Sequence, residues 1–259
     1  MCELIEDVRA AMLAHAEAEF PREACGLIVL DADGRLAYVQ SENLAPLGAE
    51  GKDQFVIDPE SWCAAEEEGR IEAIVHSHPN GTAQPSMADR LECARSGLPW
   101  FIVAWPSAVI RRIEPEQWAA PLVGRTFHHG VLDCYTLLQD YYRRRLNITL
   151  PDFERDDEWW ARPEGAPNSD LYATQFEQAG FVRVQGPPQV HDVLMMQVAA
   201  RRWNHAAIYT SDDRILHHLH GHVSCHETYD DAWRGRTKAV LRHIYRIRPD
   251  EAAAQLMAA

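Results

Sequence analysis

The segment His76-Ser77-His78-Pro79 combines residue types that bind metal ions in proteins. The apolar residues from Ile71 onward predict a strand that ends in this segment. Because side chains alternate along a strand, His76 and His78 should point to the same side. Asp89 falls in the first turn of a predicted helix and could add a carboxylate. Three protein ligands with a fourth position for water are typical of a catalytic zinc site, where zinc brings the pKa of that water close to neutrality.

Glu23 could complete the chemistry of this site. It precedes the strand expected from Cys25 and offers a carboxylate that can move a proton. A plainer interpretation stays open. An HxH pair is common without a metal ion, and Ser86 to Asp89 also fits a helix-capping arrangement.

Cys134 is a candidate nucleophile, because it follows Asp133 at the start of a predicted helix. A thiol at a helix N-terminus feels the positive end of the helix dipole, which favours the thiolate. A nucleophile also needs a nearby base. His205 begins an alternating strand, and the chain turns at Asp212-Asp213. With a three-residue loop, His205 would lie diagonal to His217 on one face, so that His217 could orient His205 as the third member of a triad.

Ordinary explanations stay open for these residues as well. A lone cysteine is usually a small buried hydrophobe. His217 also belongs to a cluster of surface-type histidines that could bind adventitious metal, with His218 and His220 expected to face away from His205. The cluster comprises His217, His218, His220, His222 and His226.

Periodicity and turn residues predict the elements that must position these side chains. In the first half, helices are expected at 4–16, 59–68 and 87–96, and strands at 25–30, 35–39, 55–57, 71–76 and 100–105. This alternation indicates an α/β domain. The pattern loosens over 113–123, where we expect a boundary. In the second half, helices are expected at 134–146 and 171–179, and strands at 181–184, 193–198, 205–209 and 215–219.

Composition limits the classes of partner. The 259 residues are 46% hydrophobic and carry a formal net charge of −14. An acidic chain is a poor match for nucleic acid or an anionic membrane surface, since both attract basic faces. No apolar run approaches the length of a membrane helix, and the acidic N-terminus does not resemble a signal peptide, so we expect synthesis in the cytoplasm. The six cysteines are scattered, which makes a disulfide framework unexpected.

His76-Ser77-His78, followed after seven residues by Ser86 and after two more by Asp89, resembles the signature of the JAMM metallopeptidases. The segment PREACGLI, which contains Glu23, resembles the glutamate-bearing stretch of that family. The resemblance implies an MPN fold, which is α/β and cytidine-deaminase-like, over residues 1–115. It implies one zinc ion held by His76, His78 and Asp89, with Glu23 as general base and Ser86 holding the carbonyl oxygen in the transition state.

Asp133-Cys134 at a helix start resembles the nucleophile segment of the NlpC-type peptidases, which have a papain-like α+β fold with a circularly shifted order of elements. The segments 190–194, 205–209 and 216–217 resemble the rest of that pattern. The resemblance implies that Cys134 is the nucleophile, His205 the base and His217 the orienting residue. Tyr135 and Thr136 stand where Ser and Gly are usual, and His191 where Gly is usual. The first of these departures could reshape substrate access.

The pairing of the two domains, at 1–115 and 122–248 with a linker at 116–121 and a tail at 249–259, resembles the tail assembly protein K family of lambda-like phages. The resemblance implies a tail-tip location, other tail-tip proteins as partners, and cleavage of peptidoglycan stem-peptide amide bonds near D-glutamate and a diamino acid. Because JAMM relatives cut isopeptide bonds beside ubiquitin-like folds, a tail protein with such a fold is the implied target of the zinc site. Two other functions stay open: a cellular enzyme that processes ubiquitin-like proteins, and a structural tail-tip component with vestigial sites.

Overall fold

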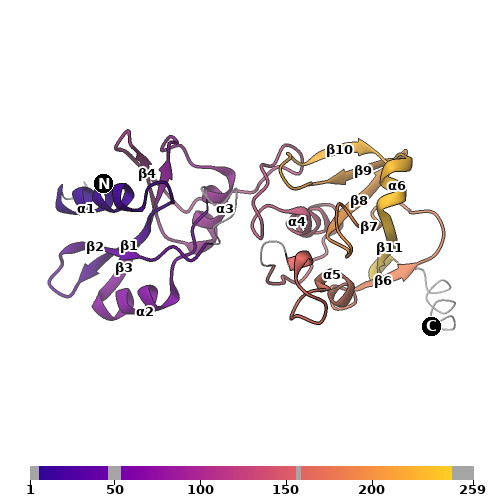
Figure 1. The fold of residues 1–259 in the computed structure, drawn as a ribbon, viewed down its shortest axis with the longest axis horizontal. Coiled ribbons are helices and arrows are strands. Elements are labelled where there is room, and N and C mark those ends of the chain that lie inside the picture. Colours follow the sequence, from indigo (N-terminus) through magenta and orange to yellow (C-terminus); the bar gives the residue numbers. More distant parts are fainter. Residues whose placement is uncertain (1–5, 46–53, 156–158, 247–259) are drawn as a thin grey trace. The chain divides into compact units, whose positions relative to one another are not determined.

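The computed structural model describes residues 6–45, 54–155 and 159–246 (Figure 1). The chain divides into two compact units, Met1–Ala119 and Ala120–Ala259, and each is described by itself. The tail expected at 249–259 and the first two residues of the helix expected at 4–16 lie outside the described residues. Among the described residues, no helix combines the length and the apolar character that crossing a membrane requires.

The first unit is built on a five-stranded sheet with the order β2-β1-β3-β4-β5. Its strands are β1 (Cys25–Asp31), β2 (Leu36–Ser41), β3 (Gly69–Pro79), β4 (Trp100–Trp105) and β5 (Val109–Ile113). Only the β3–β4 pair is parallel, with His76 opposite Ile102, and helix α3 (Met87–Ser96) connects these two strands. The other pairs are antiparallel. The sheet is therefore mixed, and the predicted α/β class is confirmed.

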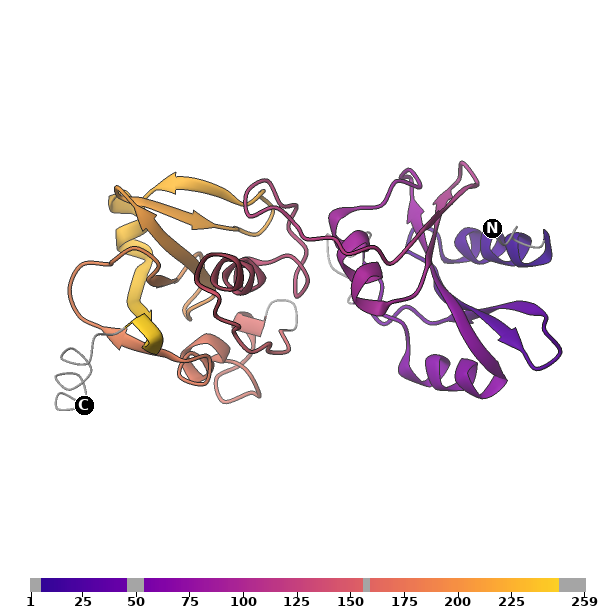
Figure 2. The same ribbon diagram turned by 180° about the vertical axis from the view of Figure 1, so that it is seen from behind.

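Helices cover both faces of this sheet (Figures 1 and 2). Val8 and Met12 of α1 (Glu6–Glu19) pack with Val75 and other side chains of one face. Ala65 of α2 (Pro59–Glu68) and Cys93 of α3 pack with side chains of the opposite face, which include Leu27 and Ile74. Because alternate residues of β3 point to opposite faces, His76 and His78 share the face of Ile74, on which α2 and α3 lie.

Two expectations for the first unit are wrong. The segment 55–57 is not a strand, because its only pairing among the described residues is an isolated bridge between Asn43 and Ile57. The strand β5 was missed, since its exposed arginines hide the apolar alternation. It forms the edge of the sheet and reaches into the region where we expected a domain boundary.

The second unit has a six-stranded antiparallel sheet with the order β10-β9-β8-β7-β11-β6. Its strands are β6 (Phe181–Val184), β7 (Val193–Met196), β8 (His205–Ser211), β9 (Arg214–His217), β10 (Cys225–Thr228) and β11 (Thr237–His243). Helix α4 (Cys134–Leu146) packs its apolar residues against one face, and Trp233 of α6 (Asp231–Arg236) packs against the other. A helix on an antiparallel sheet confirms the predicted α+β class.

The boundaries of four predicted elements of the second unit differ in the structure. Helix α5 (Leu171–Gln175) ends well before Gly180, β7 ends at Met196, β8 extends to Ser211, and β9 ends at His217. The elements β10, α6 and β11 were missed. The strand β11 lies inside the sheet although it carries Arg242, because that guanidinium is buried in a bidentate ion pair with Asp192, with both distances at 2.8 Å.

Removing one partner of this buried ion pair should strongly destabilise the second unit. The substitution Asp192→Asn leaves Arg242 buried without its counter-charge, and we expect it to lower the free energy of opening of β7 and β11 by about 3–5 kcal/mol. Hydrogen exchange of the β7 and β11 amides measures this change. Asp213→Asn is the matched control, because it removes the Arg234 partner from an exposed pair and should leave the same amides unaffected. Equal protection in both variants would contradict the prediction.

Candidate functional site

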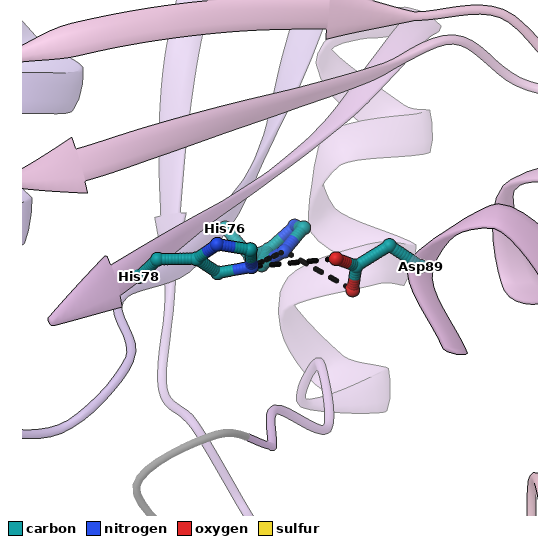
Figure 3. Close-up of side chains that lie close together, drawn as sticks. All are labelled: His76, His78 and Asp89. Carbon is teal, nitrogen blue, oxygen red and sulfur yellow. Dashed lines mark hydrogen bonds and ion pairs between the residues drawn. The ribbon is translucent and has the colours of Figure 1, made fainter. Parts of the chain in front are cut away.

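Three side chains of the first unit converge at the end of β3 (Figure 3). The Nε2 atoms of His76 and His78 lie 3.0 Å apart. The Asp89 Oδ1 atom lies 3.4 Å from His76 Nε2, and Oδ2 lies 3.3 Å from His78 Nε2. Donor atoms in a tetrahedral zinc shell with bonds near 2.0–2.2 Å are separated by about 3.3 Å. These residues therefore fit a zinc ion and form a candidate metal site.

Helix capping places the carboxylate of this group. Ser86 is the N-cap of α3, and its Oγ accepts a hydrogen bond from Asp89 N at 3.0 Å. In return, Asp89 Oδ2 accepts one from Ser86 N at 2.7 Å. The helix-capping interpretation and the metal-ligand interpretation therefore do not exclude each other, because the same Asp89 carboxylate caps α3 and lies beside both histidines.

The surroundings hold the two imidazoles in place. The Nδ1 of His78 lies 2.7 Å from the Thr82 carbonyl oxygen, so Nδ1 carries the proton and leaves the Nε2 lone pair for a cation. His76 stacks on Phe55 with ring centroids 4.7 Å apart and meets Trp100 edge-on. Ring orientation on both histidines is therefore set before any ion binds.

The charges at this site suit metal binding. Burial lowers the pKa of His76, which keeps its imidazole neutral at neutral pH. Burial raises the pKa of Asp89, but the adjacent imidazoles and the backbone N–H of Ser86 outweigh that effect and hold its pKa well below the usual range. Neutral imidazoles with an ionised carboxylate are the protonation states that zinc requires.

Glu23 lies at the same end of the sheet and is buried, with 3% exposure. In the β1–β3 register Cys25 pairs with His76, and the Ala24 and Ser77 backbones continue this pairing through a 2.9 Å hydrogen bond. Extending the register by one more residue sets Glu23 opposite His78. The Glu23 backbone therefore lies at the end of the sheet where the histidine pair is found.

In the second unit, Cys134 is the first residue of α4, and Asp133 is its N-cap. Asp133 Oδ1 accepts a hydrogen bond from Thr136 N at 2.8 Å, and Thr136 Oγ1 accepts one from Asp133 N at 2.8 Å. Arg155 pairs with the same carboxylate at 2.9 Å, and both side chains are buried. The backbone that carries the thiol is thereby fixed by a capping box and a buried ion pair.

The environment of the thiol differs from our expectation. Burial raises the pKa of Cys134 to about 11, and the charge of Asp133 adds to this, so the thiol is protonated at neutral pH despite its place at a helix N-terminus. Its side-chain hydrogen bond goes to the hydroxyl of Tyr172 at 3.2 Å. Sequence reasoning missed Tyr172, because nothing in the short helix α5 indicates a contact with a residue so far away in the chain.

His205 and His217 meet across the β8–β9 hairpin, with His205 Nε2 3.1 Å from His217 Nδ1. The turn has only two residues, Asp212 and Asp213, both with positive φ. A bulge at Thr210 restores the register that we expected from a three-residue loop, so that His217 pairs with Ala207 and lies diagonal to His205. Burial lowers the pKa of His205 to about 3, which leaves its ring neutral.

Cys134 and His205 line one pocket of about 290 Å³, together with Tyr172, Trp160, His218 and His220. The pocket lies where α4 and β8 begin and where β7 and β9 end. His218 and His220 were expected to face away from His205, and this is wrong. Because β9 ends at His217, strand alternation no longer governs the residues that follow it.

Comparison with known families matches each unit separately. Residues 6–120 match the prokaryotic homologues of the JAB domain, and residues 124–242 match the NlpC/P60 family. Among solved structures, a JAB1/MPN domain protein from Archaeoglobus fulgidus aligns with 42% of this chain and 85% of its own, at 20% identity and a TM-score of 0.28.

Two relatives extend over both domains. The tail tip assembly protein K of Escherichia phage N15 is 40% identical over 233 residues, which cover 90% of this chain and 93% of the relative. The tail tip assembly protein K of Escherichia phage lambda is 40% identical over 188 residues, which cover 72% of this chain and 89% of the relative. With this identity over most of both lengths, the chain belongs to the tail tip assembly protein K family, with a JAB domain followed by an NlpC/P60 domain.

Proposed function

We propose that this chain acts at the phage tail tip, in contact with other tail-tip proteins, as a cysteine peptidase that cuts amide bonds of peptidoglycan stem peptides near D-glutamate and a diamino acid. The supporting observation is the pocket that Cys134 shares with His205, together with the 3.1 Å contact between His205 Nε2 and His217 Nδ1. A pocket of this size accommodates a short peptide rather than a folded protein chain.

The protonation states favour general-base attack over a resting thiolate. His205 Nε2 faces His217, so only Nδ1 can serve the thiol. Nδ1 takes the Cys134 proton as Sγ bonds to the amide carbonyl carbon, and then gives this proton to the leaving amine. Water next attacks the thioester, loses its proton to Nδ1, and releases the acid and the thiol.

We further propose that the first unit holds one zinc ion through His76, His78 and Asp89 and acts as an amide or isopeptide hydrolase. Zinc, when bound, supplies Lewis-acid activation of water. In this proposal Glu23, two residues before β1, moves a proton beside His78, and Ser86 donates its hydroxyl hydrogen to a substrate carbonyl oxygen while its Oγ caps α3. A tail protein with a ubiquitin-like fold is the proposed substrate.

One alternative is favoured by a specific observation. The protonated, buried thiol of Cys134, which is hydrogen-bonded to Tyr172, suits a structural tail-tip component in which the cysteine has no catalytic role. Such a protein would assemble into tails and cleave nothing. A cellular enzyme acting on ubiquitin-like proteins would instead require cleavage of such a fusion, lost in Glu23→Ala.

Substitution of the nucleophile tests the first proposal. We expect Cys134→Ala to reduce muropeptide cleavage by at least about 10⁴-fold, because removing one member of a triad removes most of its contribution. Product formation from purified muropeptides, followed by mass spectrometry, measures this loss. Cys63→Ala, which removes an exposed thiol of the other unit, should cleave like the wild type. Absence of cleavage by the wild type, with normal incorporation into tails, would instead support the structural role.

Alkylation tests the protonation state of the thiol. With the pKa of Cys134 raised to about 11, the thiolate fraction increases with pH over the whole neutral and mildly alkaline range. The rate of iodoacetamide modification of the Cys134 peptide should therefore rise about tenfold per pH unit between pH 7 and pH 10. A rate already constant above pH 6 would reveal a resting thiolate paired with His205 and would reject the general-base proposal.

Metal content tests the second proposal. His78→Ala removes one of three ligands, and we expect zinc affinity at this site to fall by more than about 100-fold, because even indirect partners of ligands change affinity by 10–100-fold. Equilibrium dialysis followed by elemental analysis compares the variant with the wild type. His15→Gln, which alters a buried histidine bonded to Tyr38, is the control and should retain the ion. Equal zinc content in the wild type and in His78→Ala would reject the proposed zinc site.

A further inference from the structure

A second group of side chains that could bind a metal ion lies at the Nε2 atom of His217, and none of its members lines the Cys134 pocket. Strand register pairs Cys225 of β10 with His217 of β9. Cys225 Sγ lies 3.9 Å from His217 Nε2, and Glu227 Oε1 lies 3.6 Å from the same nitrogen. The third separation, between Cys225 Sγ and Glu227 Oε1, is 3.7 Å. We call this group the rear cluster.

These separations fit a small cation. Tetrahedral zinc with bonds of about 2.0 Å to nitrogen or oxygen and about 2.3 Å to sulfur separates its ligand atoms by roughly 3.3–3.6 Å. The rear cluster therefore needs only a slight contraction to surround an ion. A thiolate, an imidazole and a carboxylate together select zinc and similar divalent ions over magnesium or calcium.

Neighbouring residues hold this geometry. The indole Nε1 of Trp233 donates a 2.8 Å hydrogen bond to Glu227 Oε2, which directs the other carboxylate oxygen to the cluster. The Trp233 ring also meets the edge of His217, with centroids 4.7 Å apart. His217 is buried whereas the Glu227 side chain is 47% exposed, so an ion there would keep a position open to solvent.

We propose that the rear cluster binds a zinc-like divalent cation and that this cation silences the cysteine peptidase by reversing the tautomers of His217 and His205. The proposal rests on the proposed role of His205 as base. In the active state His205 Nε2–H donates to His217 Nδ1, so the His217 proton is on Nε2, beside Glu227. His205 Nδ1 then has a free lone pair for the thiol.

A cation on His217 Nε2 excludes the proton from that atom. The His217 proton moves to Nδ1, and the Cys225 thiol releases its proton to solvent. A metal-bound histidine donates its other N–H to a neighbour, and here that neighbour is His205 Nε2, at 3.1 Å. The His205 proton is then confined to Nδ1, which can no longer accept the proton of Cys134. The His217 Nδ1–H also opposes formation of an imidazolium on His205, because it occupies the Nε2 lone pair that a second proton would need.

Cobalt absorption tests the site without relying on activity. Full-length protein titrated with Co²⁺ should show a thiolate-to-cobalt charge-transfer band, and Cys225→Ser should lose it. The candidate site of the first unit contains no thiol, so it cannot produce this band. Cys63→Ser is the matched control and should retain the band. A band absent from the wild type, or one that persists in Cys225→Ser, overturns the site. Glu227→Gln should weaken cobalt binding and serves if Cys225→Ser misfolds.

Nitrogen NMR and kinetics test the silencing. In protein labelled with ¹⁵N-histidine, the His205 proton should be on Nε2 with chelator and on Nδ1 with zinc; an unchanged tautomer overturns the proposal even if no substrate is cleaved. Zinc should lower kcat/KM on muropeptides at least tenfold relative to chelator, and Cys225→Ser should resist. Equal inhibition of Cys225→Ser would show that the inhibitory ion binds elsewhere and would reject the rear cluster. If the protein cleaves no muropeptide in the presence of chelator, this result counts against the proposed function alone. The cobalt charge-transfer band and the His205 tautomer still decide the proposal for the rear cluster.

Discussion

The capping of two helix N-termini is the constraint on which both candidate sites depend. The first turn of a helix leaves backbone N–H groups without partners inside the helix, and a side chain must supply acceptors. At α3 the acceptors are Ser86 Oγ and the Asp89 carboxylate, and the carboxylate that completes the cap also faces two imidazoles. At α4 the Asp133 carboxylate caps the helix and binds Arg155, which fixes Cys134 in place. Helix capping therefore positions a side chain of each candidate site.

Desolvation acts on the histidines of the two units in the same direction, with different consequences. It lowers the pKa values of His76 and His205, so both rings remain neutral. A neutral ring is the form that can bind a metal ion in the first unit and the form that can accept a proton in the second. For Cys134 the same burial opposes the thiolate, and the nearby Asp133 charge offsets what the helix dipole could contribute. The pocket that Cys134 and His205 line thus holds two neutral side chains.

Local sequence rules predict the parts of these sites that depend on a single element or one tight turn. Strand alternation places His76 beside His78, and a hairpin brings His205 to His217. Contacts set by tertiary packing are not predictable in this way. Tyr172 reaches the thiol from a five-residue helix, and β11 takes an interior place in its sheet only because Asp192 neutralises Arg242. The position of His218 was missed because it depends on where a strand stops.

The bulge at Thr210 has a consequence for how this hairpin can vary among relatives. Thr210 is the one extra residue of β8, and without it Tyr209 and Ser211 would still face Ile215 and Arg214. Straightening the strand at unchanged length would instead shift every partner by one position and bring His218 opposite Ala207, which separates His205 from His217. A relative that is one residue shorter here can therefore keep the histidine pair by losing the bulge.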